Sequence, residues 1–290
     1  MKITMYAPAK INLFFNILSK QKDSYHTINT VMQSVDIYDI LTIEKTANDK
    51  IQLKGDLENI CKVKDNTAHK AAKAFLKHAK LNFGLTIFCQ KKIPVESGLG
   101  GESADASAVL LALNKMFFNK FETEKLCKIA KNIGADIPFF INGGCVFAKG
   151  IGEKINPIKT KLRFFLVIVK PSFGVSTKKA YKIFDEKKII FAENCGDFIK
   201  KVEKNNLKEV SESLFNCFEG TLNIKEIFDI KNKFKNYKAL GSSMSGSGSA
   251  VFGIFEDRKT AEFCFLKFRK EYEHVFICKT INFGCRIFKK

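Results

Sequence analysis

The stretch that decides the fold is KKIPVESGLGGESADASAVLLALN, at residues 91–114. Its glycines Gly98, Gly100 and Gly101 lack a Cβ atom, so the backbone can turn sharply and bring its N–H groups close to a ligand. Apolar residues then recur at spacings of three and four, which predicts an amphipathic helix that begins near Ser103. The unpaired N–H groups and positive dipole end of such a helix suit an anion such as phosphate.

This loop departs from the two commonest nucleotide-binding motifs. A Walker loop needs Gly-Lys-Ser/Thr before the helix, whereas Gly101 is followed here by Glu102. A dinucleotide fingerprint needs a third glycine at the position of Ser103. Three glycines before a helix can also form a plain turn between a strand and a helix. A phosphate loop and a tight turn are therefore both open at this point.

The composition indicates a globular protein with a lysine-rich surface. The 290 residues are 46% hydrophobic and carry a formal net charge of +19, almost all of it from dispersed lysines. Nucleic-acid readers favour arginine, whose planar donors form bidentate contacts, so dispersed lysines favour a solvated surface that steers small polyanionic substrates. We therefore expect a small-molecule partner and no nucleic acid.

The cysteines and the apolar runs indicate in which cellular compartment the protein works. The nine cysteines form an odd number without a C-x-x-C pair, and several, such as Cys89, Cys264 and Cys278, lie in apolar runs. Free thiols in a reducing cytoplasm are the expected state. No apolar run is long enough for a membrane span, and the four histidines lack metal-ligand spacing. We expect a cytoplasmic protein with no membrane association and no protein-bound metal.

Strands and helices alternate along both halves of the chain, which predicts an α/β or α+β architecture. Alternating apolar positions predict two strands within residues 3–45, joined by a polar turn at 21–24. Further strands are predicted at 85–89, 163–171, 250–255 and 274–281, and helices at 67–81, 123–133, 177–184, 197–202, 207–218 and 259–272. Gly134 is expected to cap the second of these helices, and residues 151–161 are the best candidate for a domain boundary.

Three other segments carry polar residues in unusual places. The glycine- and serine-rich run LGSSMSGSGSAVFGIF at 240–255 fits either a flexible linker or a tight anion-binding loop. Lys10 and Asn12 precede an apolar strand, and Asp136 lies between a helix end and a proline. Judged alone, Lys10 can be a solvated lysine and Asp136 a carboxylate in a turn or at a helix N-cap. Together with the glycine loop they supply the donors, cation and carboxylate that phosphoryl transfer to an alcohol needs.

With these residues in view, the chain resembles the GHMP small-molecule kinases. The resemblance rests on APAKINL near the start, DSYHTINTVMQSVD at 23–36, the IPxxxGLGG loop, IGADIPFF, and MSGSGSAVF. APAKINL, Tyr25-His26 and GADIPFF are typical of members whose substrate is a cytidine diphosphate sugar alcohol. Members that phosphorylate homoserine or mevalonate are the nearest alternative, and a basic RNA-binding protein is a second one.

The resemblance implies a fold and a chemistry. It implies a ribosomal-protein-like N-terminal domain at residues 1–158 and a ferredoxin-like C-terminal domain at 159–290, whose last strand can return to the first domain. It also implies transfer of phosphate from ATP to the 2-hydroxyl of the substrate, with Mg²⁺ carried mainly by the nucleotide. ATP and substrate are expected to meet between the domains.

The resemblance also assigns roles to single residues. Asp136 is expected to accept the proton of the 2-hydroxyl, while Lys10 orients Asp136 and stabilises charge on the reacting oxygens. The expected nucleotide contacts are Asn66 and Lys91 at the adenine, Gly98, Leu99, Gly100, Gly101 and Ser103 at the phosphates, and Pro94, Ser245, Gly246, Ser247 and Gly248. The expected substrate contacts are Asn12 in the sugar pocket, Tyr25 and Tyr181 on the faces of the cytosine, and His26 at its edge.

Two of these assignments leave alternatives open. Tyr25-His26 can form a surface turn, and Phe184 can take the place of Tyr181. The loop itself departs from the family pattern, because Glu102 stands where glycine is expected and Ala104 where serine is expected. A carboxylate beside a triphosphate repels it unless Mg²⁺ intervenes or the side chain turns away. We expect Glu102 to turn outward and act as a favourable acid at the helix N-terminus.

Overall fold

Two long strands organise the N-terminal half of the computed structural model, which describes residues 1–21 and 25–288. β1 (Lys2–Lys20) and β2 (His26–Thr46) pair antiparallel along nearly their whole length, with irregularities at Pro8/Ala9, Asn12/Phe14 and Ile17/Ser19. The strands predicted within 3–45 are confirmed. The predicted turn at 21–24 falls mostly on residues 22–24, which lie outside the described residues.

The first sheet grows outward from this hairpin in the order β12-β1-β2-β4-β3. β3 (Ile51–Gly55) and β4 (Gly84–Gln90) run parallel, so they need a crossover, which runs through two 3₁₀ turns and α1 (Thr67–Ala79). The two turns are η1 (Asp56–Asn59) and η2 (Val63–Asp65). Four further strands complete the sheet. β5 (Cys145–Gly150) pairs with β2, β6 (Lys154–Pro157) pairs with β5, and both β8 (Phe215–Asn216) and β12 (Arg286–Ile287) pair with β1.

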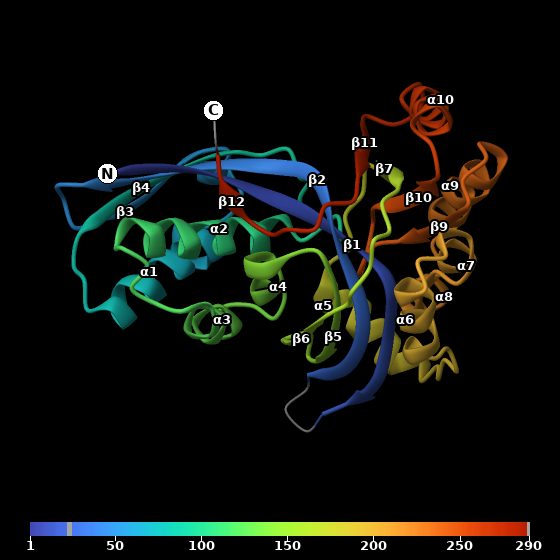
Figure 1. Ribbon diagram of the computed structural model, residues 1–290, viewed down its shortest axis with the longest axis horizontal. Helices are drawn as coiled ribbons and strands as arrows, with labels where there is room; N and C mark the ends of the chain where they lie inside the picture. Colours follow the sequence, from blue (N-terminus) through green and yellow to red (C-terminus); the bar gives the residue numbers. More distant parts are fainter. Residues whose placement is uncertain (22–24, 289–290) are drawn as a thin grey trace.

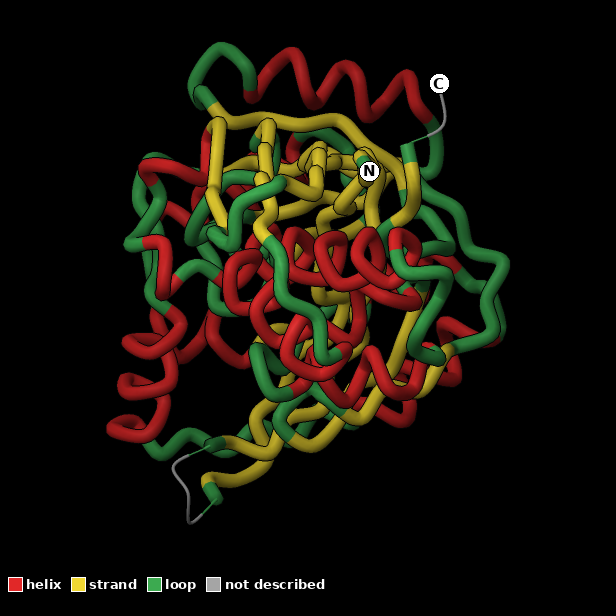
Figure 2. The backbone as a smooth tube through the Cα atoms, turned by 90° about the vertical axis from the view of Figure 1, so that its left-hand side faces the viewer, coloured by secondary structure: helices red, strands yellow, loops and turns green. Residues whose placement is uncertain are grey.

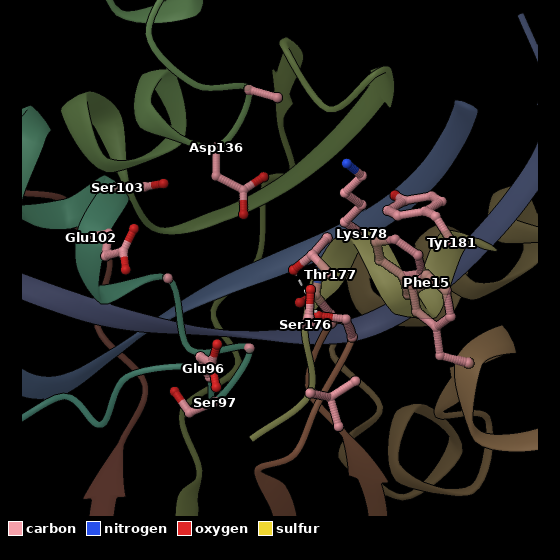
Figure 3. Close-up of a pocket in the computed structure, with 18 of the residues that line it drawn as sticks. Phe15, Glu96, Ser97, Glu102, Ser103, Asp136, Ser176, Thr177, Lys178 and Tyr181 are labelled. Atoms are coloured by element: carbon pink, nitrogen blue, oxygen red, sulfur yellow. Dashed lines mark hydrogen bonds between the residues drawn. The ribbon is translucent and has the colours of Figure 1, made fainter. Parts of the chain in front are cut away.

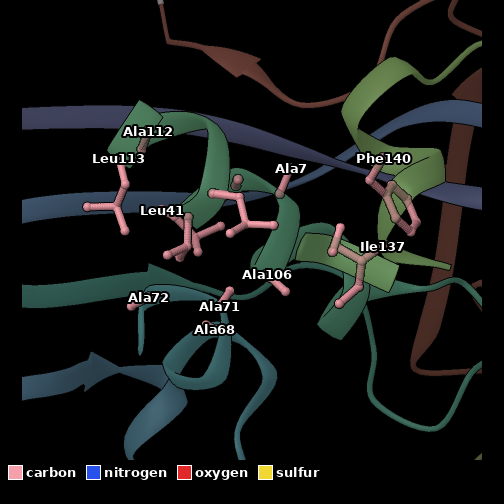
Figure 4. Packing of buried hydrophobic residues seen from close by; sticks show 14 of the residues in the cluster. Ala7, Leu41, Ala68, Ala71, Ala72, Ala106, Ala112, Leu113, Ile137 and Phe140 are labelled. Carbon is pink, nitrogen blue, oxygen red and sulfur yellow. The ribbon is translucent and has the colours of Figure 1, made fainter. Parts of the chain in front are cut away.

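Helices cover one face of this sheet (Figures 1 and 2). They are α1, α2 (Gly101–Met116), α3 (Thr123–Lys131) and α4 (Ile137–Asn142). Figure 4 shows the alanines of α1, including Ala68, Ala71 and Ala72, packed in the same apolar cluster as Leu113 of α2. These small side chains let the two helices approach closely, which holds the N-terminus of α2 in a fixed place.

Two helix ends differ in detail from the prediction. α2 begins at Gly101, two residues before Ser103, because Gly100 adopts a left-handed conformation and serves as its N-cap. α3 ends at Lys131, and its C-cap is Asn132 at φ −74°, so the left-handed glycine cap expected at Gly134 does not form.

The C-terminal half contains an antiparallel sheet in the order β11-β7-β10-β9. Its strands are β7 (Phe165–Lys170), β9 (Gly241–Met244), β10 (Val251–Phe255) and β11 (His274–Lys279). α5 (Thr177–Lys187), α6 (Cys195–Glu203), α7 (Leu207–Glu212), α8 (Cys217–Leu222) and α9 (Lys225–Asn236) connect β7 to β9, and α10 (Arg258–Phe268) connects β10 to β11. This strand–helix–strand–strand–helix–strand arrangement confirms the ferredoxin-like expectation.

The single helix predicted at 207–218 is wrong. The chain leaves α7 at Ser213 and forms the short strand β8 beside β1. Asn216 then caps α8, since its side chain accepts a hydrogen bond from the N–H of Phe218 at 2.9 Å. A strong N-cap residue inside an apparently helical run therefore marks a break and a new start.

The two halves share an apolar core. Ala9, Ile11 and Leu13 of β1 belong to the same buried cluster as Leu166 and Ile168 of β7. Because side chains alternate across a strand, the even-numbered residues of this part of β1 face the opposite side, where the site described below is built. β12 also crosses back from the C-terminal half, with Ile287 opposite Met5. The boundary between residues 158 and 159 stays a prediction.

All nine cysteines are free thiols. Cys89, Cys264 and Cys278 are buried, and burial raises the pKa of Cys264 to about 12, so these thiols stay protonated. Across residues 1–21 and 25–288, no helix combines the length and the apolar character that a membrane crossing requires.

Candidate active site

One cavity of about 890 Å³ collects most of the residues expected in the site. Its walls come from β1 and β2, the glycine loop before α2, the start of α4, α5, and the loop after β9 (Figure 3). The expected residues that line it are Lys10, Asn12, Tyr25, His26, Lys91, Pro94, Gly98, Gly100, Gly101, Ser103, Asp136, Tyr181, Gly246 and Ser247. The carboxylate of Asp136 and the N-terminus of α2 thus share one cavity.

Four expected nucleotide contacts do not line the cavity: Asn66, Leu99, Ser245 and Gly248. Asn66 caps α1, with its Oδ1 accepting from the N–H of Ala68 at 2.9 Å. Leu99 is fully buried, and its carbonyl accepts from the N–H of Lys10 at 3.0 Å. Ser245 is also buried, and Gly248 packs beside Met244. These positions support the loops, and their nucleotide contacts stay predictions.

The two glycine-rich segments pack directly against each other. Ser245 Oγ donates to the carbonyl of Gly98 at 2.9 Å, and the N–H of Ala250 donates to the carbonyl of Ser97 at 3.0 Å. Ser245 and Ser249 are fully buried. The linker interpretation of the second segment is therefore wrong, because a flexible linker would be exposed and unpaired.

Gly98→Ala is expected to weaken both the fold and ATP binding. Gly98 has φ +75°, and a Cβ atom there would lie 1.9 Å from the carbonyl oxygen of Ser245. The conformational strain alone costs about 1–3 kcal/mol of unfolding free energy, and relieving the clash separates the two loops. Chemical unfolding and the KM for ATP measure the two effects. Gly220→Ala is the matched control, because Gly220 lies in α8 where a Cβ meets Phe191 at 3.5 Å, and it should not destabilise the protein.

The first turn of α2 opens into the cavity. Its N-cap, Gly100, has no side chain that could occupy the terminal N–H groups, and Gly101 and Ser103 line the cavity wall. A sixteen-residue helix carries a positive dipole end at this point. The phosphate-loop interpretation therefore has the geometry it needs, and the plain-turn alternative does not account for the cavity.

Lys10 is buried at the centre of the site, with only 4% of its surface exposed. Its Nζ donates to Oδ1 of Asn12 at 2.5 Å and lies 4.0 Å from Oδ2 of Asp136. Burial lowers the pKa of Lys10, and the nearby Asp136 carboxylate opposes that shift. The solvated-lysine alternative is wrong.

Asp136 occupies the N-cap position of α4, but its side chain makes no capping hydrogen bond. Its carboxylate instead faces the cavity, opposite the side chains of α5 (Figure 3). The side chain is 38% exposed, so a hydroxyl group in the cavity can reach it. Asp136 therefore occupies the expected turn and N-cap position, but its carboxylate does not serve as the cap.

Two buried carboxylates that we did not predict hold Lys91. Its Nζ lies 2.5 Å from Oδ2 of Asp39 and 2.6 Å from Oδ2 of Asp105, both of which are almost completely buried. Burial lowers the pKa of Lys91, but the two carboxylates outweigh this and raise it. Burial also raises the pKa of Asp105 to about 7, although Lys91 opposes the shift. This cluster lies beside Gly101 at the start of α2.

Aromatic residues form the far end of the cavity. The rings of His26 and Tyr181 lie 4.7 Å apart at 30°, and Tyr25 lines the wall with 59% exposure. Phe184 meets His26 edge-on at 6.4 Å and is absent from the lining, so Tyr181 is the ring that faces the cavity. His26 is 8% exposed and begins β2, which excludes a surface turn at that residue.

Glu102 differs from the expectation in one respect. It lies in the first turn of α2 and is exposed to solvent, as expected of a favourable N-terminal acid. It also lines the cavity, and Figure 3 shows its carboxylate beside Ser103 on the cavity side. Glu102 is thus exposed to solvent as expected, and it also borders the cavity.

Glu102→Gly is expected to leave kcat/KM within a few fold of the wild type. Hydration screens the repulsion that Glu102 exerts on a triphosphate, so its removal changes the energy of the bound state little. The measurement is steady-state kinetics across a series of Mg²⁺ concentrations, with Glu102→Gln as the control that keeps the size of the side chain. A collapse in rate, together with a higher Mg²⁺ requirement in both variants, would instead identify Glu102 as a metal ligand.

Residues of α5 were missed in the sequence, apart from Tyr181. The N-cap Ser176 and, within α5, Thr177, Lys178 and Asp185 all line the cavity. Thr177 Oγ1 lies 3.0 Å from Ser247 Oγ in the loop after β9. The available signal was the spacing of Thr177, Tyr181 and Asp185, which places them along one helix face.

Comparison with known proteins agrees with this geometry. Residues 66–144 match the family of GHMP kinases N terminal domains, and residues 198–274 match that of GHMP kinases C terminal domains. The chain is 42% identical, over 95% of its length and 99% of the relative, to a 4-diphosphocytidyl-2-C-methyl-D-erythritol kinase of Clostridium botulinum strain Hall.

Solved structures show the same fold. A crystal structure of 4-(cytidine 5'-diphospho)-2C-methyl-D-erythritol kinase matches with a TM-score of 0.80 and 26% identity, covering 97% of this chain and 99% of the other. A homoserine kinase from Cytophaga hutchinsonii matches with a TM-score of 0.78 and 19% identity, covering 99% of this chain and 97% of the other. The second likeness shows a common fold alone.

Proposed function

This chain belongs to the GHMP kinase family, and we propose that it phosphorylates the 2-hydroxyl of 4-diphosphocytidyl-2-C-methyl-D-erythritol with ATP as the donor. The reaction is a step of the non-mevalonate route to isoprenoid precursors. The single observation that carries the proposal is the shared cavity: the N-terminus of α2, the carboxylate of Asp136 and the aromatic group around His26 all line it. One end suits phosphates, the other suits a flat base, and the carboxylate lies between.

The nucleotide belongs at the glycine-rich end. Main-chain N–H groups of the glycine loop and the dipole of α2 support the phosphates of ATP, with the loop after β9 packed against them. Asn66 and Lys91 stay the proposed contacts to the adenine, and Pro94 stays a proposed contact to the nucleotide. Lys91 would offer its aliphatic chain there, since Asp39 and Asp105 hold its ammonium group.

The sugar alcohol and its base belong at the opposite end. Asn12 is held by Lys10 and Thr30, with its Nδ2 donating to Thr30 Oγ1 at 2.8 Å, so its amide has a fixed orientation toward the sugar pocket. Tyr25 and Tyr181 offer aromatic faces for the cytosine, and His26 offers a polar ring nitrogen for its edge.

The chemistry that we propose uses two side chains. Asp136 accepts the proton of the 2-hydroxyl as its oxygen attacks the γ-phosphorus, and the bond from that phosphorus to the bridging oxygen of ADP breaks. Lys10 lies 4.0 Å from the carboxylate, so its positive charge can orient Asp136 and offset the negative charge of the transferred group. The surrounding amides stabilise the same charge from the side of α2.

A magnesium ion fits this cavity as a companion of the nucleotide. Glu102, Ser103 and Asp136 offer oxygen atoms of the kind that Mg²⁺ prefers. Within the described residues, no three acidic, histidine or cysteine side chains cluster closely enough to hold a metal by themselves. When bound, Mg²⁺ would neutralise charge on the phosphates, which would supply most of its ligands. The nine free thiols support a location in the reducing cytoplasm.

A direct assay tests the function. Purified protein is incubated with Mg²⁺, ATP and 4-diphosphocytidyl-2-C-methyl-D-erythritol, and ADP and the 2-phosphate product are measured. Homoserine and mevalonate are offered in parallel under the same conditions. Formation of the 2-phosphate with the cytidine substrate alone supports the proposal, whereas comparable turnover of either competitor contradicts it.

A further inference from the structure

Asp185 holds the imidazole of His26 at the base end of the cavity. His26 Nε2 lies 2.6 Å from Asp185 Oδ1, and Lys20 Nζ lies 2.6 Å from Oδ2 of the same carboxylate. All three side chains line the cavity. Lys20 ends β1, His26 begins β2, and Asp185 lies on α5, so this carboxylate ties both strands of the hairpin to the helix across the cavity.

Two residues of α5, Tyr181 and Asp185, hold the imidazole of His26 in place. Tyr181 and Asp185 are four residues apart and therefore lie on the same helix face. The ring of Tyr181 packs against the face of the imidazole at 4.7 Å, while Asp185 bonds to one of its nitrogens. His26 is 8% exposed, so its ring has little freedom to turn.

The charge on Asp185 decides which nitrogen of His26 carries the proton. Burial opposes ionisation of Asp185, but the hydrogen bonds from Lys20 and His26 outweigh it and lower the pKa of the carboxyl. The carboxylate is therefore ionised at neutral pH and can only accept hydrogen bonds. Whenever the ring of His26 is neutral, its proton must then lie on Nε2, which leaves a lone pair on Nδ1.

We propose that Asp185 is a positioning residue that makes His26 Nδ1 a hydrogen-bond acceptor and so selects cytosine over uracil. Cytosine presents an amino group at C4, which donates to such an acceptor, whereas uracil presents a carbonyl oxygen there. Two acceptors facing each other leave both without a hydrogen bond, which is costly in a partly buried site. The inference rests on the proposed function, because it assumes that a cytidine base reaches His26.

Asp185→Asn tests the inference through base discrimination. The amide can accept from Nε2 or donate to it, so it no longer dictates where the proton lies. We expect the preference for the cytidine substrate over its uridine analogue, measured as the ratio of kcat/KM values, to fall by about tenfold or more. The same fall is expected in the ratio of dissociation constants for cytidine and uridine diphosphate.

Glu186→Gln is the matched control. It removes the same charge from the next position of α5, where Glu186 pairs with Lys182 at 3.9 Å and is 61% exposed. Base discrimination in this variant should equal that of the wild type. Thermal unfolding of both variants checks that the helix remains folded.

Nitrogen-15 NMR of histidine-labelled protein reads the proton position directly. The signals of His26 are assigned by their loss in His26→Gln. We expect protonated Nε2 and unprotonated Nδ1 in the wild type, and a mixture or the reverse in Asp185→Asn. An Nδ1-protonated ring in the wild type overturns the proposal. Reduced discrimination without a change of tautomer also overturns it, because Asp185 would then contact the base itself.

The binding and NMR measurements separate this inference from the proposed function. If the wild type phosphorylates neither substrate, the proposed function fails, while the diphosphate affinities and the tautomer still decide the role of Asp185. If phosphorylation occurs and Asp185→Asn keeps full discrimination by both measures, the inference alone is wrong.

Discussion

Asp136→Asn is expected to lower kcat for phosphorylation of 4-diphosphocytidyl-2-C-methyl-D-erythritol by about 10²–10⁴-fold. Asparagine has the same shape as aspartate but cannot accept the proton of the attacking hydroxyl. The carboxylate makes no capping hydrogen bond in α4, so its replacement removes little that holds the fold. Steady-state release of ADP measures the rate, and equilibrium binding of both substrates should change by only a few fold.

Asp197→Asn is the control for this variant, because Asp197 forms an exposed pair with Lys200 on α6 at 2.9 Å and does not line the cavity. It should keep full activity. An Asp136→Asn enzyme within fivefold of the wild type would remove Asp136 from the mechanism. A protein that binds RNA with steep salt dependence, and does so equally well with Asp136→Asn, would favour the RNA-binding alternative instead.

Lys10→Met is expected to lower kcat by about 10²–10³-fold, the usual loss when one preorganised donor to the reacting oxygens is removed. Methionine has a similar length and suits a position that is 4% exposed, so the variant should fold. Loss of the hydrogen bond to Asn12 and relief from burying a charge act in opposite directions on the free energy of unfolding. Single-turnover kinetics with saturating ATP isolates the chemical step.

Lys54→Met is the matched control for Lys10→Met. Lys54 is 51% exposed and lies 3.9 Å from Glu58, in a surface pair of small energetic value. Its replacement should leave kcat unchanged. If Lys10→Met keeps kcat and raises only the KM for ATP, Lys10 binds the ground state and does not stabilise the transition state.

The glycine loop, α2 and the strands around them could be predicted because their signals are local. Glycine spacing, helical periodicity and alternation each depend on residues close together in the chain. The joining of Lys10, Asp136 and the Ser245 segment came from the chemical needs of phosphoryl transfer and from the resemblance, since no local pattern brings residues so far apart in the chain to one cavity. The break between α7 and α8 was not predicted, because the apolar residues on both sides of it continue a helical pattern. The pairing of Phe215 with β1, which marks the break, is a tertiary contact that no local pattern shows.

The charged partners inside the site were the least predictable part. Asp39 and Asp105 look like ordinary strand and helix residues, and only the folded chain shows that both hold Lys91. Asp105 did carry a usable signal, because a carboxylate on an otherwise apolar helix stretch needs a buried cation. Asp185 carried a weaker signal, since its partners Lys20 and His26 lie on the other side of the cavity.

The pairing of β12 with β1 places a constraint on the nascent chain. β1 leaves the ribosome first, yet the strand that covers its outer edge at Met5 and Tyr6 is synthesised only after the whole C-terminal sheet. At translation speeds of about 5–20 residues per second, this edge stays open for tens of seconds. An open strand edge is a template for pairing with other chains. Chaperone protection of the emerging N-terminal half would therefore matter until synthesis of the chain has reached β12.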